Sequence, residues 1–157
     1  MRKRLITPTA ATVRSRAEGW LDVECAAIVE ITSEEKDHPV ESAFSSGETQ
    51  GWRAAGSGQQ TIRLVFDQPQ RLNRISLTFE EKEMARTQEF VLRCSSDGGI
   101  AFREVVRQQW NFSPPETTRE IESYEVELSN VTVLELNIVP DVSGGTAHAS
   151  LKSLRLS

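Results

Sequence analysis

Histidine and cysteine are scarce in this sequence, and their scarcity limits the chemistry that it can perform. Two histidines, His38 and His148, and two cysteines, Cys25 and Cys94, lie far apart along the chain. A zinc site needs clustered Cys or His ligands, and nucleophilic catalysis needs a base beside an activated Ser or Cys. We therefore expect no enzymatic activity, no catalytic residue, no metal ion and no cofactor. Both cysteines fall in apolar segments, which predicts buried free thiols rather than a disulfide.

Long apolar segments are missing as well. None approaches the ~20 residues that a membrane-spanning helix needs, and the charged N-terminus never reaches the apolar segment of a secretory signal. We therefore expect no membrane partner. As written, the sequence predicts a cytoplasmic protein, with an extracellular location as the alternative if a leader was removed.

Acidic residues are absent from the first sixteen positions, which carry five positive charges, whereas the whole chain has a formal charge of −5. Residues 17–157 therefore carry −10. We interpret residues 1–17 as a basic tail and residues 18–157 as one domain, in line with the length of 157 residues. Such a tail can contact nucleic acid, but an acidic domain repels phosphate. Nucleic acid is therefore the least favoured partner.

Helical periodicity is weak, and strand-like alternation takes its place. Apolar residues alternate with polar ones in segments such as 61–67, 90–94 and 124–128, the pattern of strands with one buried face. Asp97-Gly98 predicts a tight hairpin between two of the strands. About eight strands, separated by Gly and Pro turns, predict an all-β fold, a jelly-roll β-sandwich of antiparallel strands.

Several local features follow from the same pattern. The alternation over residues 21–31 predicts one long first strand, and residues 40–44 can form a single helical turn. Gln68-Pro69-Gln70 and Asn130 are turn residues, so we expect each of them to separate two strands.

The order of the segments along the chain is more specific than any one of them. The series is Ile31-Thr32-Ser33, Ala43 to Gly47, Trp52, Ile62 to Asp67, Leu72 to Leu77, Ser95 to Gly98, Asn130-Val131-Thr132 and Ala149-Ser150-Leu151. It resembles the coagulation factor 5/8 type C (discoidin) family of galactose-binding-domain-like jelly rolls. The resemblance covers residues 21–157 and implies a scaffold for binding rather than an enzyme.

A second, local pattern combines Trp52-Arg53-Ala54-Ala55 with Gly58 and Thr61-Ile62. It is similar to the amino-terminal domain of the eukaryotic DNA single-strand-break repair scaffold, which has the same jelly roll. The similarity is confined to these few positions, so it implies a shared fold and no shared function.

Many discoidin family members hold a structural calcium ion near an Asp-Gly turn, and this sequence departs from that pattern. Ser45 or Ser46 stands where the turn aspartate is expected, and Ser153, beside Lys152, where a closing glutamate is expected. Calcium prefers several oxygen ligands that include carboxylates. We therefore expect no calcium, although Glu48 could supply part of a site.

The resemblance implies that a ligand binds at one end of the sandwich, between loops 34–39, 45–51 and 80–87. The candidate ligand-binding residues are Glu35, His38, Glu48, Trp52, Arg53 and Trp110.

Structural alternatives exist for four of these candidates. Trp52 occupies a position that plugs the core in the family, and Trp110 could belong to the buried face of its strand. Arg53 could pair with a nearby acid, and His38 could be a solvated loop residue. If both tryptophans are buried and no pocket lies at the loop end, the sugar hypothesis fails.

The sequence as a whole predicts a non-catalytic binding module that recognises carbohydrate or another small polar ligand. Charged loops that are poor in aromatic residues also suit a protein–protein interaction or assembly module, which is the alternative. Contact with nucleic acid through the basic tail is a third hypothesis. The sequence leaves the oligomeric state open, because exposed strand edges permit self-association.

Overall fold

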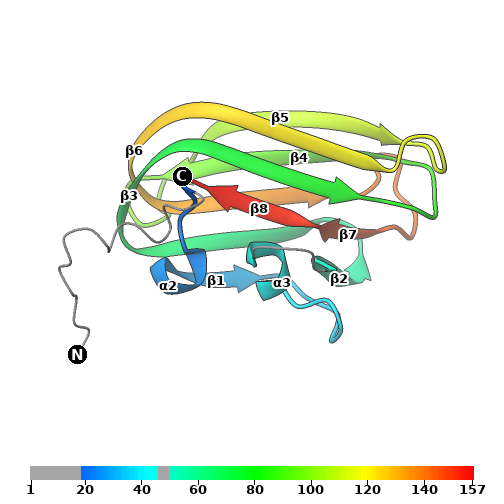
Figure 1. The fold of residues 1–157 in the computed structure, drawn as a ribbon, viewed down its shortest axis with the longest axis horizontal. Helices are drawn as coiled ribbons and strands as arrows, with labels where there is room; N and C mark the ends of the chain where they lie inside the picture. The colour runs from blue at the N-terminus through cyan, green and yellow to red at the C-terminus, as the bar shows by residue number, and fades with distance from the viewer. Residues whose placement is uncertain (1–18, 46–49) are drawn as a thin grey trace.

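The computed structural model describes residues 19–45 and 50–157. Antiparallel strands and two one-turn helices make up this part of the chain (Figure 1). In chain order the elements are α2 (Val23–Ala26), β1 (Ala27–Ile31), α3 (Glu41–Phe44), β2 (Trp52–Ser57), β3 (Gln60–Glu80), β4 (Arg86–Ser95), β5 (Arg103–Phe112), β6 (Arg119–Val139), β7 (His148–Leu151) and β8 (Ser153–Leu156).

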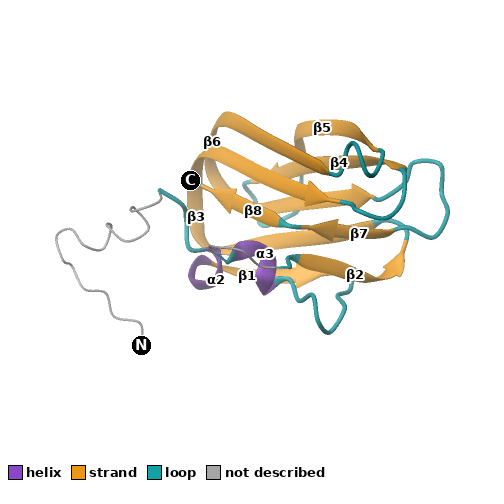
Figure 2. Cartoon of the chain, turned by 45° about the vertical axis from the view of Figure 1, so that its right-hand side comes forward, coloured by secondary structure: helices purple, strands orange, loops and turns teal. Residues whose placement is uncertain are grey.

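The long strands β3 and β6 pass through both layers of the sandwich. They pair with each other antiparallel over their whole length, with register shifts between Val65 and Arg74. The start of β3 and the end of β6 form the first layer with β1, β4 and β5, in the order β1-β3-β6-β4-β5. The end of β3 and the start of β6 form the second layer with β8. β2 and β7 make a separate two-stranded sheet (Figure 2).

The core lies between the two layers and follows the alternation in the sequence. Ile62, Leu64 and Phe66 of β3 are buried while the residues between them are only partly buried, as predicted. Phe79 from the second layer meets Phe90 from the first, with ring centroids 5.2 Å apart. Burial of such large apolar side chains is the main contribution to folding.

These features confirm the predicted all-β antiparallel sandwich, with strands β1 to β8, and the helical turn at residues 40–44 is found as α3. Other local predictions were wrong. Residues 23–26 form α2 instead of strand, because Asp22 caps the helix by accepting from the Cys25 amide at 3.3 Å. Cys25 is therefore exposed, against the prediction, while Cys94 is buried as predicted.

The two predicted turns are not strand ends either. Gln68-Pro69-Gln70 lies inside β3, where the register with β6 shifts, and such irregularities are where a strand tolerates proline. Asn130 lies inside β6 with a positive φ of 55°. Both positions mark the bends by which the two strands pass from one layer to the other.

The basic tail and two turn positions, Ser46 and Glu48, lie outside the described residues. Within residues 19–45 and 50–157, no helix combines the length and the apolar character needed to cross a membrane.

Candidate ligand-binding site

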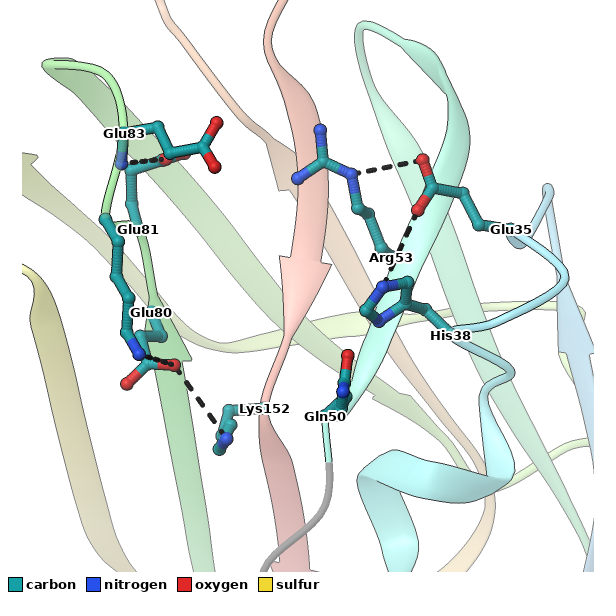
Figure 3. Close-up of a pocket in the computed structure, with 9 residues that line it drawn as sticks. Glu35, His38, Gln50, Arg53, Glu80, Glu81, Glu83 and Lys152 are labelled. Carbon is teal, nitrogen blue, oxygen red and sulfur yellow. Dashed lines mark hydrogen bonds and ion pairs between the residues drawn. The ribbon is translucent and has the colours of Figure 1, made fainter.

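A hollow of about 790 Å³ lies at one end of the sandwich (Figure 3). Three separate parts of the chain converge on it: the loop before α3, the start of β2, and the segment that ends β3. A lysine between β7 and β8 completes it. The lining residues are Glu35, His38, Gln50, Arg53, Glu80, Glu81, Lys82, Glu83 and Lys152. This is the end at which the three loops of the discoidin resemblance were expected to meet.

One wall of the hollow is formed by Glu35, His38 and Arg53. Backbone hydrogen bonds join the loop to β2, from the Glu35 amide to the Arg53 carbonyl at 2.8 Å and from the Arg53 amide to the His38 carbonyl at 3.2 Å. The Arg53 Nε donates to Glu35 Oε2 at 3.1 Å, and His38 Nε2 lies 4.0 Å from Glu35 Oε1.

Among the described residues, the only side-chain hydrogen bond of Arg53 comes from its Nε. Its side chain is 42% exposed, and its terminal nitrogens point away from Glu35 into the space between the two walls (Figure 3). The ion pair with Glu35 therefore orients the guanidinium at the hollow and does not remove it from the site.

The opposite wall begins with Glu80, at the end of β3. Glu80 Oε2 accepts from Arg119 Nη2 at 3.0 Å, while Oε1 lies 3.8 Å from Lys152 Nζ and 3.9 Å from Lys82 Nζ. Burial alone would raise the pKa of Glu80, but the Arg119 hydrogen bond and the lysine charges bring it below its ordinary value. Glu80 is therefore a carboxylate at neutral pH.

Glu81 holds the rest of that wall in place. Its Oε2 accepts from the amides of Glu83 and Met84 at 3.0 and 3.3 Å, and its Oε1 accepts from Arg86 Nε at 2.7 Å. Burial opposes ionisation, yet these donors lower the pKa of Glu81 as well. The carboxylate thus closes the turn between β3 and β4 around itself.

The two walls together offer hydrogen bonds in both directions. Arg53, Lys82 and Lys152 carry donors, Glu35, Glu80 and Glu83 carry acceptors, and none of the nine lining residues is Phe, Tyr or Trp. A general acid needs a pKa near or above the working pH, whereas Glu80 and Glu81 both have lowered pKa values. Glu80 and Glu81 are therefore carboxylates at neutral pH and act as hydrogen-bond acceptors.

The predicted site residues fall into four groups. Glu35, His38 and Arg53 lie together in the hollow, and Glu48 is outside the described residues. Trp52 takes the core position that was given as its alternative, because the side chain is 1% exposed and its Nε1 donates inward to the Ser33 carbonyl at 2.9 Å. Trp110 is half-buried on β5 and does not line the hollow.

Six residues of the hollow were not among the candidates, Gln50, Glu80, Glu81, Lys82, Glu83 and Lys152, and four of them belong to the expected loop 80–87. Gln50 lies in one of the three expected loops but has no charge or aromatic ring to single it out. Lys152 was noted only as an argument against calcium, and it reaches the site because β8 pairs with the end of β3. Among the described residues, no three His, Cys, Asp or Glu side chains are arranged to hold a metal ion.

Comparison with solved structures identifies the fold. The chain has the jelly roll of carbohydrate-binding modules. A family 32 module from Clostridium perfringens NanJ, in complex with galactose, superposes with a TM-score of 0.66 at 14% identity, over 87% of this chain and 96% of that one. A second Clostridium perfringens module, in complex with GalNAc-β-1,3-galactose, gives 0.63 at 19% identity, over 88% and 99%.

The family 32 module of AlyQ, in complex with 4,5-unsaturated mannuronic acid, gives a TM-score of 0.64 at 16% identity, over 88% of this chain and 98% of that one. No protein-family model and no curated protein sequence matches the chain. These similarities confirm the galactose-binding-like jelly roll that the discoidin resemblance implied.

Proposed function

We propose that this protein is a non-catalytic binding module that holds carbohydrate in the hollow at the loop end. The observation that carries the proposal is the convergence of Arg53 and Glu35 with the Glu80–Glu83 segment in one open polar hollow. Three modules of the same fold are solved with galactose, GalNAc-β-1,3-galactose and 4,5-unsaturated mannuronic acid. A carbohydrate role also suits the extracellular alternative better than the cytoplasmic one.

The chemistry of the hollow matches hydroxyl groups. Each sugar hydroxyl both donates and accepts a hydrogen bond, and the hollow places Arg53 and Lys152 opposite Glu80 and Glu83. The fork of Arg53 can donate to two neighbouring hydroxyl oxygens, which gives the contact directional specificity. Because no Phe, Tyr or Trp ring lines the hollow, binding would depend on these hydrogen bonds, and we expect a Kd of roughly 1 mM.

The Arg53→Gln substitution tests the proposal. Loss of a charged donor is worth roughly 1.5–3 kcal/mol, so we expect affinity for the bound sugar to fall about ten- to hundredfold. Titration calorimetry with galactose, N-acetylgalactosamine and galacturonate, on wild type and variant, measures the change.

Arg107→Gln is the matched control for this experiment. Arg107 is an exposed arginine on β5 that pairs with Glu104 and Glu89, as Arg53 pairs with Glu35, but it lies outside the hollow. Its loss should leave affinity unchanged. Equal affinity of wild type and Arg53→Gln, or no binding of any of the three sugars, would refute the proposal.

A protein partner is the second candidate function, and one observation favours it. The hollow is lined by charged, amide and imidazole side chains without Phe, Tyr or Trp, which suits an ionic contact with another protein. Binding of this kind weakens steeply as salt is raised, whereas hydrogen bonding to a neutral sugar does not. A partner protein held by ionic contacts should be released by about 0.5 M salt. If the Arg53→Gln variant retains that protein as well as wild type does, Arg53 makes no contact with it, and this candidate is contradicted.

A further inference from the structure

The side of the sandwich between β5 and the start of β6 is an open edge. Among the described strands, β5 pairs only with β4, and residues 119–128 of β6 pair only with β3. The two strands belong to different layers and border the same side of the molecule (Figure 1). The side chains that they turn inward therefore decide what fills this edge of the core.

Several of those inward-facing side chains are polar, although Phe112 of β5 and Leu128 of β6 are buried and apolar. Residues directly opposite each other in an antiparallel pair point to the same face. On β6, Glu120, Glu122 and Tyr124 lie opposite the buried residues Phe79, Leu77 and Ile75. On β5, Gln108 and Trp110 lie opposite Phe90 and Gln88, which are both fully buried.

Arg86 supplies the first unpaired donor at this edge. The residue is 4% exposed, and its guanidinium stacks 4.8 Å above the Phe112 ring. Its Nε is paired with Glu81, and its Nη1 donates to the Pro140 carbonyl at 2.7 Å and to Gln88 Oε1 at 3.3 Å. Its Nη2 is buried and has no hydrogen-bond partner among the described residues. A buried donor left unpaired costs about 1–3 kcal/mol.

Trp110 and Glu120 hold the other unpaired atoms, and Trp110 Nε1 is buried without a partner in the described part of the chain. Glu120 is 0% exposed; its Oε1 accepts from Gln88 Nε2 at 3.2 Å and its Oε2 has no donor. Beside it, the Glu122 carboxylate accepts from the Tyr124 hydroxyl at 3.0 Å. The three buried polar atoms without partners in residues 19–45 and 50–157 all belong to this cluster.

We propose that this cluster, the edge site formed by Arg86, Gln88, Trp110, Glu120, Glu122 and Tyr124, binds a neutral sugar residue independently of the loop-end hollow. The partly buried Glu122 carboxylate can accept from a sugar hydroxyl. The two N–H donors without partners in the described part of the chain are buried, and they meet a hydroxyl only when the side chains over them move aside. The half-buried rings of Trp110 and Tyr124 offer apolar faces for the C–H groups of a sugar. Glu122 repels an anionic ligand and Arg86 a cationic one, so a neutral ligand is favoured.

Indole N–H signals in a ¹⁵N-correlated NMR spectrum test the proposal directly. The chain has three tryptophans: Trp110 reports the edge site, Trp52 reports the loop end through its bond to Ser33, and Trp20 lies under Arg74. The probes are galactose, glucose and N-acetylgalactosamine, with galacturonate as the anionic comparison. We expect the Trp110 signal, assigned with Trp110→Phe, to move saturably with at least one neutral sugar and to stay still with galacturonate.

Three further variants separate the edge site from the loop-end hollow. Glu122→Gln removes a charged acceptor, so the affinity for sugar measured from the Trp110 signal should fall roughly tenfold. Glu127→Gln lies on the exposed face of the same strand and should leave that affinity unchanged. Arg53→Gln should also leave it unchanged, so the proposed function can fail while the edge site stands. A Trp110 signal that no neutral sugar moves, that moves equally in Glu122→Gln, or that Arg53→Gln abolishes would overturn the proposal.

Discussion

Replacing Glu120 with glutamine tests whether the polar edge of the core holds a neutral carboxyl group. Burial and the neighbouring Glu122 raise the pKa of Glu120 from 4.5 to about 8. Between these pH values the unfolded chain releases the proton while the folded chain keeps it, so stability falls as pH rises. At about 1.4 kcal/mol for each pKa unit, the loss between pH 4.5 and 8 amounts to roughly 5 kcal/mol as an upper limit.

The Glu120→Gln variant should lose this pH dependence. Its amide cannot ionise, and its oxygen can still accept from Gln88. We therefore expect wild type and variant to have similar free energies of unfolding near pH 5, and the variant to be more stable by several kcal/mol at pH 8. The subtraction cancels the titrating groups that do not interact with Glu120, whereas Glu122, which does interact with it, contributes to the difference.

Urea denaturation followed by tryptophan fluorescence, at intervals from pH 5 to pH 8.5, measures both curves. Glu127→Gln, an exposed position on the same strand, is the control and should run parallel to wild type. If Glu120→Gln also runs parallel to wild type across this range, Glu120 is ionised in the folded protein and the assignment of a neutral carboxyl is wrong.

Three further substitutions give expected outcomes that the same denaturation assay checks. Arg86→Met should cost about 3–5 kcal/mol, because it leaves Glu81 and the Pro140 carbonyl without their buried donor; a change below about 1 kcal/mol would contradict it. Trp52→Ala should cost about 3–5 kcal/mol as a core truncation, whereas lost affinity at unchanged stability would restore Trp52 as a ligand residue. Glu81→Gln should lower the free energy of unfolding at neutral pH. Because the folded-state pKa of Glu81 is lowered, the difference in this free energy between wild type and variant should shrink below pH 4.5. A difference that stays constant on acidification would refute this.

The strands could be predicted wherever the alternation of residues gives a strand one apolar face. Segment 61–67 and the strand that ends at Cys94 have one apolar face each, and both are strands with that face buried. Alternation failed at residues 23–26, where the Asp22 side chain caps a helical turn and a local hydrogen bond outweighs the pattern. It also could not show that β3 continues through Pro69, because a bend and a turn use the same residues.

The candidate site was predictable by its loops and less so by its residues. Glu35, His38 and Arg53 follow from loop position, since the loop pairs with the start of β2. Lys152 could not be found in this way, because its approach to Glu80 depends on the pairing of β8 with β3, far away in the sequence. Contacts of that kind are set by tertiary register, which local sequence does not contain.

The polar edge, in contrast, was within reach of the sequence. Tyr124, Val126 and Leu128 alternate toward the core, and the same period continued backward places Glu122 and Glu120 inside and Ile121 outside. The structure has this arrangement, with Glu120 fully buried and Ile121 63% exposed. A strand that buries glutamates and exposes isoleucine gives up stability, and such conflicts between pattern and packing concentrate where a protein binds its ligands. The alternation that predicts the fold therefore also indicates the edge site, because there it places glutamates inside and isoleucine outside.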